Sequence, residues 1–218
     1  MQISTETIQI LKNFASINGN ILIRKGKTLS TISTAKNIFA KATVAEDFPM
    51  EVAIYDLNSL LALLTLMENQ NVDFGSKSLT ISKDNGKFEY FYSNLNVIVA
   101  APDKTIELDS YFEFKLSAEE VNMLMKAAAI TAAPTISIVS SDKKVVLVVG
   151  DKKNDTANTY RKTIGESEND FECHVAVENF KIIPGSYTAT VSKKKLLHFK
   201  NAAKELEYFI AMEPDSSI

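Results

Sequence analysis

The sequence predicts an α+β fold of two similar domains, each built from antiparallel β-sheets with two α-helices. Two observations predict this class. A capped amphipathic helix opens near Ser4 and again at Ser117, about half of the 218-residue chain later. Closely spaced strand-like runs follow each helix, without the alternation of strand and helix that builds a parallel sheet. The repeated unit is as long as a domain, so we expect two domains, 1–105 and 106–218, and no solenoid.

The two opening helices are predicted from apolar spacing and from their first residues. The first is expected from Ser4 to about residue 18, because apolar residues stand at 10, 11, 14 and 17 on one helical face. The second begins after Ser117, where Ser117 and Glu120 have the serine-x-x-glutamate spacing that satisfies free amides at a helix start. It is expected to run to about residue 130 and to bury a stripe that includes Met125. Taken singly, each pattern is typical of a solvated amphipathic helix on a sheet.

Short apolar and β-branched runs bounded by turn-forming residues predict the strands. In the first half they lie at 21–24, 28–32, 37–44, 50–55, 71–74, 78–82 and 87–92, with a helix at 57–67 capped by Asp56. In the second half they lie at 111–116, 135–139, 144–149, 157–164, 170–176, 186–191, 196–199 and 207–212, with a short helix at 177–183. The segment 94–110 is expected to be an extended linker that contains the domain boundary.

The composition is that of a globular protein, with 45% hydrophobic and 23% charged residues. A formal net charge of −3, with neither half basic, argues against tight nucleic-acid binding and leaves only local, salt-sensitive contacts. The single cysteine excludes an intramolecular disulfide. No segment has the features of a secretion signal or of a bilayer-spanning helix, so we expect a cytosolic protein without membrane contact.

The sequence contains no arrangement of residues that is typical of an enzyme. Among seven glycines, no pair has the spacing of a phosphate-binding loop. Cys173 and His174 are adjacent, so in a strand they face opposite sides, and a metal site would need more ligands at suitable spacing. We therefore expect no catalytic residue, no metal and no cofactor. Scattered carboxylates leave a hydrolase as a less favoured interpretation.

Four segments of the sequence resemble one family. They are LKNFASIN at 11–18, VAIYDLN at 52–58, PGSY at 184–187 and YFIAMEPDS at 208–216. In this order they resemble the DNA polymerase sliding clamp of T-even-type tailed bacteriophages, and 71–110 is the least similar part. The resemblance implies the DNA-clamp fold, in which three identical two-domain subunits form a ring around duplex DNA, with helices inside and sheets outside.

The function implied by this resemblance is that of a processivity factor, which tethers the replicative DNA polymerase to its template and is not an enzyme. An ATP-dependent clamp loader and late-transcription factors are further implied partners, and the implied location is the cytoplasm of the infected host cell. The alternative is a β-rich protein-interaction or structural subunit without DNA contact. A threefold assembly with a DNA-sized hole would distinguish the two.

The DNA-facing residues are expected on the polar faces of the two main helices, because phosphate contacts hold DNA without reading its sequence. A weaker candidate lies on the short helix at 177–183. The complete set is Gln9, Lys12, Asn13, Ser16, Asn122, Lys126 and Lys181. The helix at 57–67 contributes no lysine, unlike the strongly basic bores of other clamps.

Two further sets of residues follow from the resemblance. A hydrophobic partner-peptide pocket would use the linker and the C-terminal strand, although its residues could equally close the domain core: Val97, Ile98, Val99, Phe209, Ile210, Met212 and Pro214. Ring closure would pair edge strands at 111–115 and 156–163, with the interface candidates Tyr111, Phe112, Tyr160 and Arg161.

Overall fold

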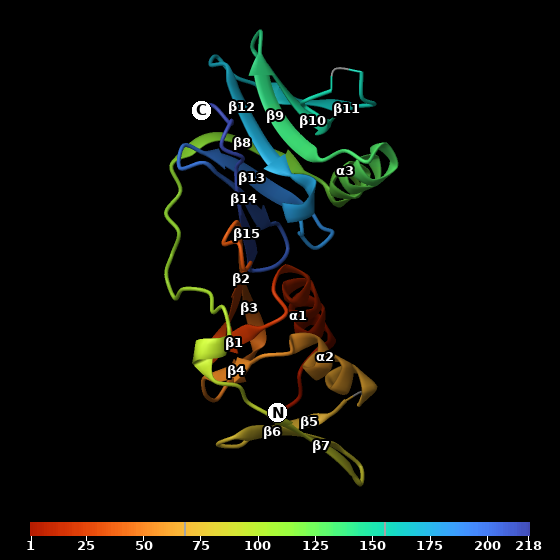
Figure 1. The fold of residues 1–218 in the computed structure, drawn as a ribbon, viewed down its shortest axis with the longest axis vertical. Helices are drawn as coiled ribbons and strands as arrows, with labels where there is room; N and C mark the ends of the chain where they lie inside the picture. Colours follow the sequence, from red (N-terminus) through yellow and green to blue (C-terminus); the bar gives the residue numbers. More distant parts are fainter. Residues whose placement is uncertain (68, 155) are drawn as a thin grey trace. The chain divides into compact units, whose positions relative to one another are not determined.

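The computed structural model describes residues 1–67, 69–154 and 156–218. The chain divides into two compact units, Met1–Lys104 and Thr105–Ile218, and each has its own helices and sheets (Figure 1). The division falls within the segment 94–110 that the sequence predicts to be a linker. No helix among the described residues combines the length and the apolar content needed to cross a bilayer.

The N-terminal unit is a helix pair with three small antiparallel sheets. Its elements are α1 Thr5–Ile17, β1 Ile21–Ile23, β2 Gly26–Ile32, β3 Ile38–Phe48, β4 Val52–Ile54, α2 Leu57–Leu66, β5 Asn71–Phe74, β6 Ser78–Lys83, β7 Gly86–Phe91 and the 3-10 helix η1 Leu95–Val97. Strand β1 pairs with β4, β2 with β3, and β5, β6 and β7 follow one another in a third sheet.

Helices α1 and α2 lie side by side and pack through their apolar faces (Figure 1). Phe14 of α1 and Leu57 of α2 have no exposed surface, and Leu11 and Leu60 are almost as deeply buried. Burial of side chains of this size stabilises a domain by about 2 kcal/mol each, so the inner faces of the helices fix their position on the strands. The outer face of α1 stays polar and exposed, whereas the exposed side of α2 also carries Ala62 and Leu66, the latter 70% exposed.

The C-terminal unit has one helix and two four-stranded antiparallel sheets among its described residues. Its elements are β8 Ser110–Leu116, α3 Ala118–Thr131, β9 Thr135–Ser141, β10 Lys144–Gly150, β11 Tyr160–Glu166, β12 Phe171–Ala176, the 3-10 helix η2 Val177–Asn179, β13 Tyr187–Ser192, β14 Leu196–Asn201 and β15 Leu206–Ala211. The strand orders are β11-β10-β9-β12 and β15-β14-β13-β8, and α3 packs against β10.

Two buried tyrosines organise the core of the C-terminal unit. The Tyr187 hydroxyl donates to the Ile183 carbonyl at 2.6 Å, and the Ile183 amide donates to the Tyr208 hydroxyl at 3.2 Å. Gly185 lies between Ile183 and Tyr187 in the chain, and a Cβ there would come within 2.8 Å of the Asn201 side chain. The Pro-Gly turn is therefore held by close approach as well as by hydrogen bonds.

The structure confirms the predicted starts of the three main helices. Ser4, Asp56 and Ser117 are their N-caps, and each side chain accepts a hydrogen bond from a backbone amide of the first turn. At Ser117 both bonds of the capping box with Glu120 are present. The predicted strands are all present, with ends shifted by up to a few residues.

Two predictions for the C-terminal unit are wrong in detail. The expected helix at 177–183 is only the 3-10 turn Val177–Asn179, so the described residues of this unit form one α-helix and Lys181 lies outside it. Its N-cap, Ala176, has no side chain to bond the first amides, and a segment this short cannot offset the cost of nucleation. Met125 is 38% exposed and not part of the buried stripe of α3.

Candidate nucleic-acid interface

The outer face of α1 presents the predicted DNA-facing residues of the N-terminal unit. Gln9, Lys12 and Ser16 are exposed and Asn13 is half-buried. The Ser16 hydroxyl donates to the Asn13 carbonyl at 2.6 Å, so these two groups are partly committed to the helix itself. Lys12 forms no ion pair with any residue that the structure describes, which leaves its charge available to a ligand.

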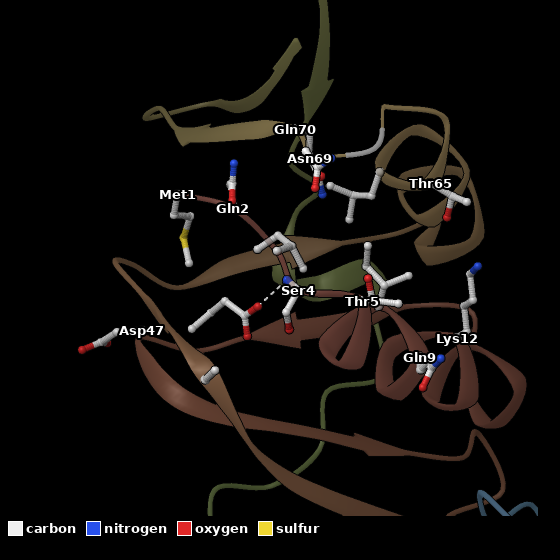
Figure 2. A pocket seen from close by; sticks show the side chains of 15 residues that line it. Met1, Gln2, Ser4, Thr5, Gln9, Lys12, Asp47, Thr65, Asn69 and Gln70 are labelled. Atoms are coloured by element: carbon white, nitrogen blue, oxygen red, sulfur yellow. Dashed lines mark hydrogen bonds between the residues drawn. The ribbon is translucent and has the colours of Figure 1, made fainter.

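A cavity of about 900 Å³ lies beside Lys12, between α1 and the end of α2. Figure 2 shows the Lys12 side chain extending from α1 toward Thr65 of α2, with Asp47 at the opposite end of the cavity. The cavity is lined by Met1, Gln2, Ile3, Ser4, Thr5, Ile8, Gln9, Lys12, Ala45, Glu46, Asp47, Leu64, Thr65, Asn69 and Gln70. Lys12 therefore supplies a positive charge that can attract a phosphate at one end, whereas the Asp47 carboxylate lies at the other.

A second hollow of about 510 Å³ continues along the α1–α2 seam on the other side of Lys12. Its lining contains no carboxylate: Lys12, Asn58, Leu61, Ala62, Thr65 and Leu66. The Asn58 amide is exposed, whereas the Thr65 hydroxyl donates to the Leu61 carbonyl at 2.7 Å. A lysine next to an exposed amide can hold a phosphate by charge and hydrogen bond without contacting bases.

Glu46 on β3 fixes the start of α1. Its carboxylate accepts from the Ser4 amide at 2.5 Å, a bond marked in Figure 2, and from the Thr7 hydroxyl at 2.5 Å. Burial alone would raise the pKa of Glu46, but the hydrogen bonds from Thr7 and Ser4 outweigh burial and lower the pKa below its ordinary value of 4.5. The carboxylate is charged at neutral pH and holds the helix that carries Lys12.

Helix α3 presents the DNA-facing residues predicted for the C-terminal unit. Asn122 and Lys126 are exposed, and Lys126 also lacks an ion-pair partner within the described ranges. Met123 and Ile130, three residues before and four after Lys126, are 50% and 85% exposed. The polar face of α3 is thus narrower than that of α1. Lys181, in the loop after η2, is half-buried.

The residues predicted to form the partner pocket differ in how much surface they keep. Ile210 has no exposed surface, and Phe209 and Met212 are 5% and 8% exposed. The Phe209 ring stacks on His198 with centroids 4.5 Å apart. These three side chains are core residues of the C-terminal unit in this structure. The remaining surface belongs to Val97, Ile98, Val99 and Pro214.

The predicted interface residues lie on strands at the ends of two sheets, β8 and β11. The rings of Tyr111 and Phe112 contact Phe171 with centroids 5.4 Å and 5.7 Å apart, so both are partly used within the unit. Tyr160 is half-buried and Arg161 is exposed on β11. Strand β11 therefore offers the more accessible side chains.

The reactive groups of the C-terminal unit are held in structural positions. Burial raises the pKa of the Cys173 thiol to about 12, which leaves it uncharged at neutral pH. His174 lies opposite Ser137 on the neighbouring strand, with Nδ1 2.8 Å from the Ser137 hydroxyl and Nε2 3.2 Å from Glu172. Both Ser137 and His174 are 6% exposed, so this row ties β9 to β12. No group of three or more potential metal ligands occurs among the described residues.

Sequence reasoning missed Glu46 and the seam residue Asn58. A readable pattern exists for Glu46: alternate residues of β3 are buried, and Glu46 occupies a buried place between Val44 and Phe48. An acid on the apolar face of a strand indicates a buried partner. Asn58 could be found only from the packing of α2 on α1, because nothing in its own segment points to a ligand.

Comparisons with known proteins agree on one family. The family model described as DNA polymerase processivity factor matches residues 4–100. The chain is 30% identical to the sliding clamp of Vibrio phage KVP40 over 98% of this chain and 99% of the relative. It is 29% and 28% identical to the sliding clamps of Escherichia phage RB69 and Enterobacteria phage T4, over 100% of this chain and 99% of each relative.

Solved structures show the same fold at lower identity. PCNA from Thermococcus kodakaraensis aligns with a TM-score of 0.70 at 14% identity, covering 97% of this chain and 98% of that chain. The sliding clamp from Pseudomonas aeruginosa aligns with a TM-score of 0.67 at 11% identity, covering 95% of this chain and 62% of that chain. The mixed fold with antiparallel sheets is thus the clamp fold, as the sequence predicts. The chain belongs to the family of DNA polymerase sliding clamps, the processivity factors of T-even-type tailed phages.

Proposed function

We propose that this chain encircles duplex DNA as a ring of three copies and tethers the replicative DNA polymerase to its template. The family is one of non-catalytic processivity factors in phage DNA replication, acting with DNA and polymerase in the infected cell. The observation that carries the proposal for this chain is the outer face of α1, where an unpaired lysine adjoins an acid-free hollow. The β-rich module without DNA contact is not favoured, because relatives along the whole chain are sliding clamps.

Weak phosphate contacts suit a protein that must stay on DNA and still move along it. Bonds to base edges would give sequence preference and would stop sliding, whereas phosphate contacts are the same at every step. Lys12 and Lys126 supply one such charge in each unit, on a chain with a net charge of −3. Retention must then come from enclosure, because two exposed lysines per copy give only a weak, salt-sensitive attraction.

Ring closure needs complementary surfaces on the two units, and free strand edges supply them. Strand β7 ends the sheet β5-β6-β7, and β11 ends the sheet β11-β10-β9-β12. Pairing β7 of one copy with β11 of the next would satisfy both edges and cover Phe91, which is 67% exposed. Such head-to-tail contacts repeat around a closed ring. This proposal keeps β11 with Tyr160 and Arg161, and its partner strand is β7 in place of the predicted β8 with Tyr111 and Phe112.

The other partners are proposed on the same basis. An ATP-dependent clamp loader would open and close the ring, and late-transcription factors would share the polymerase's docking site. The exposed linker residue Val97 and the C-terminal Pro214 are the most accessible members of the predicted pocket. A short apolar peptide bound there would have a modest, exchangeable affinity.

The test combines Lys12→Glu with Lys126→Glu and measures how much protein is loaded on circular DNA in low salt. Six reversed charges per ring should lower loading about tenfold or more, because each lost phosphate contact reduces the electrostatic attraction. The charge-matched control combines Lys25→Glu with Lys200→Glu, two exposed lysines outside the helices and outside the strands proposed for ring closure. Equal loading of the test variant and the control would contradict the assignment of the DNA-facing surface.

A further inference from the structure

The residues after β15 form a structured segment on the edge of the C-terminal unit. The Glu213 amide donates to the His174 carbonyl at 2.8 Å. Further along, Glu172 and Ser217 exchange two backbone hydrogen bonds, each of 2.8 Å, in an antiparallel bridge. Segment 213–218, here called the C-terminal strap, therefore covers part of the free edge of β12.

The strap begins with a tight turn. The Ser216 amide donates to the Glu213 carbonyl at 3.0 Å, with Pro214 in the second position, where proline favours a turn. The Ser216 side chain is 4% exposed, and its hydroxyl accepts from the His174 amide at 3.0 Å. Ser216 thus anchors the turn to β12, whereas the side chains of Glu213 and Asp215 both contact Lys152.

Two lysines from different loops hold the strap. Lys195, in the turn between β13 and β14, donates to the carbonyls of Pro214 at 3.2 Å and Ser216 at 3.1 Å. Lys152, in the loop after β10, bonds the carboxylates of both Glu213 and Asp215, the latter at 2.6 Å. Lys195 grips the backbone of the strap, whereas Lys152 depends on its two acidic side chains.

Lys152 is unusual among the lysines of its loop. Its side chain is 18% exposed, whereas the neighbouring Lys153 is exposed and makes no contact through its ammonium group with the described residues. Burial would lower the pKa of Lys152, but the hydrogen bonds and charges of Asp215 and Glu213 outweigh it and raise the pKa. Without this cation the two carboxylates on one turn would repel each other.

The Lys152–Asp215 pair also separates two hollows on the surface of the C-terminal unit. One, of about 440 Å³, is lined by Pro134, Glu213 and Pro214 among others, and the other, of about 630 Å³, by Ser137 and Arg161 among others. Both linings include Lys152 and Asp215. The position of Pro214, a member of the predicted partner pocket, is therefore set by the turn that Lys152 holds.

We propose that Lys152 is a latch: a positioning residue that fixes the C-terminal strap on β12 by its two carboxylates and thereby presents Pro214 to partner peptides. The presentation of Pro214 to partner peptides rests on the proposed partner site. The contact of Lys152 with the strap does not, because it is present in the free chain. The strap opens locally when the latch is lost, while the core of the unit stays folded.

Hydrogen exchange on the free protein tests the latch directly. In Lys152→Met, the amides of Glu213 and Ser217 should exchange about tenfold faster, because their bonds to β12 break in each local opening. Amides of β14 should not change. Lys153→Met is the matched control and should exchange like the parent protein, and Lys152→Arg should retain most of the protection. Unchanged exchange in Lys152→Met would overturn the proposal.

Reversing the charge of Lys152 tests whether its ion pairs with Glu213 and Asp215 hold the strap, as opposed to a general disturbance of the loop. Lys152→Glu should release the strap, and the triple variant Lys152→Glu, Glu213→Lys, Asp215→Lys should restore its protection because both ion pairs are rebuilt with opposite sign. Release that the triple variant does not reverse would contradict a latch formed by these charges.

Binding of a synthetic peptide with the C-terminal residues of the replicative polymerase then tests the consequence. Lys152→Met should weaken binding about fivefold, since the peptide must first order the strap, and the triple variant should recover the affinity. Unchanged affinity with faster exchange would overturn the positioning role. If the parent protein does not bind the peptide, the proposed partner site fails, and the exchange experiment still decides whether Lys152 is a latch.

Discussion

Helices α1 and α3 both begin at a serine N-cap, but the backbone amide of that serine has a different acceptor in each helix. Both begin at a serine whose hydroxyl accepts a bond from an amide of the first turn. At α3 the amide of that serine is bonded by Glu120, three residues along the same helix. At α1 the equivalent amide is bonded by Glu46, from a strand 42 residues away. The start of α3 is stabilised by its own residues, whereas the start of α1 also needs β3 in its folded position.

The two carboxylates also differ in environment and in their other partners. Glu46 is 8% exposed, and its second oxygen accepts from the Thr7 hydroxyl. The side chain of Glu120 is 30% exposed, and its second oxygen pairs with Lys162 of β11. A buried acceptor costs more to remove than an exposed one, because the donors it leaves behind cannot turn to water. The stability of the N-terminal unit should therefore depend on its cap far more than that of the C-terminal unit.

The largest effect is expected for Glu46→Ala. It leaves the Ser4 amide and the Thr7 hydroxyl without an acceptor, which should lower the free energy of unfolding by about 3 kcal/mol. Urea denaturation with a spectroscopic probe of the N-terminal unit measures this change. A loss below about 1 kcal/mol would show that the buried cap is not what holds α1.

A pH series with Glu46→Gln sharpens the same point. The pKa of Glu46 is lower in the folded protein than the ordinary value of 4.5, so the charged carboxylate stabilises the fold above that value and loses this contribution as pH falls through the lowered pKa. Glu46→Gln should cost about 1.5 kcal/mol at pH 7 and progressively less in acid. A difference in unfolding free energy that stays constant from pH 7 to strong acid would contradict the shift.

Glu120→Ala should cost about 1 kcal/mol, since it removes one half of an exposed capping box. Its effect should be confined to the first turn of α3, which hydrogen exchange at the amides near Ser117 can detect. A loss as large as that of Glu46→Ala would remove the contrast between the two helix starts.

The smallest effect is expected for Lys162→Met, which leaves the capping box intact and removes only the ion pair with Glu120. A partly exposed pair of this kind contributes about 0.5 kcal/mol, and salt should reduce the difference further. Comparing unfolding in low and high salt measures it. A salt-independent loss above about 1 kcal/mol would place this pair among the buried interactions of the unit.

Local patterns predict much of this fold, and their limits are physical. Ser117 with Glu120 is a local signal and predicts the start of α3 correctly. Glu46 serves α1 from another element, so no window around Ser4 contains it. The segment at 177–183 has apolar residues in suitable places, yet it is too short and lacks a capping side chain. The start of a helix can be predicted from local sequence when the side chains that bond its first amides lie within one turn.

Candidate site residues also differ in whether local sequence or tertiary packing determines their role. The exposure of Lys12 and Lys126 follows from helical periodicity and needs no tertiary information. The burial of Ile210 and Phe209 depends on how β15 packs within its unit, and an apolar strand looks the same in a core or in a binding pocket. Lys152 is one of two adjacent lysines in a loop, and only the folded strap distinguishes it from Lys153.

Retention on DNA of different topology tests the central claim most directly. The protein is loaded on a nicked circle, washed in high salt, and the DNA is then cut once. Enclosure predicts that the protein stays on the circle through the wash and is lost from the free ends after the cut, because exposed lysines alone cannot hold it in high salt. Equal retention before and after cutting would show that the chain grips DNA directly and would contradict the account.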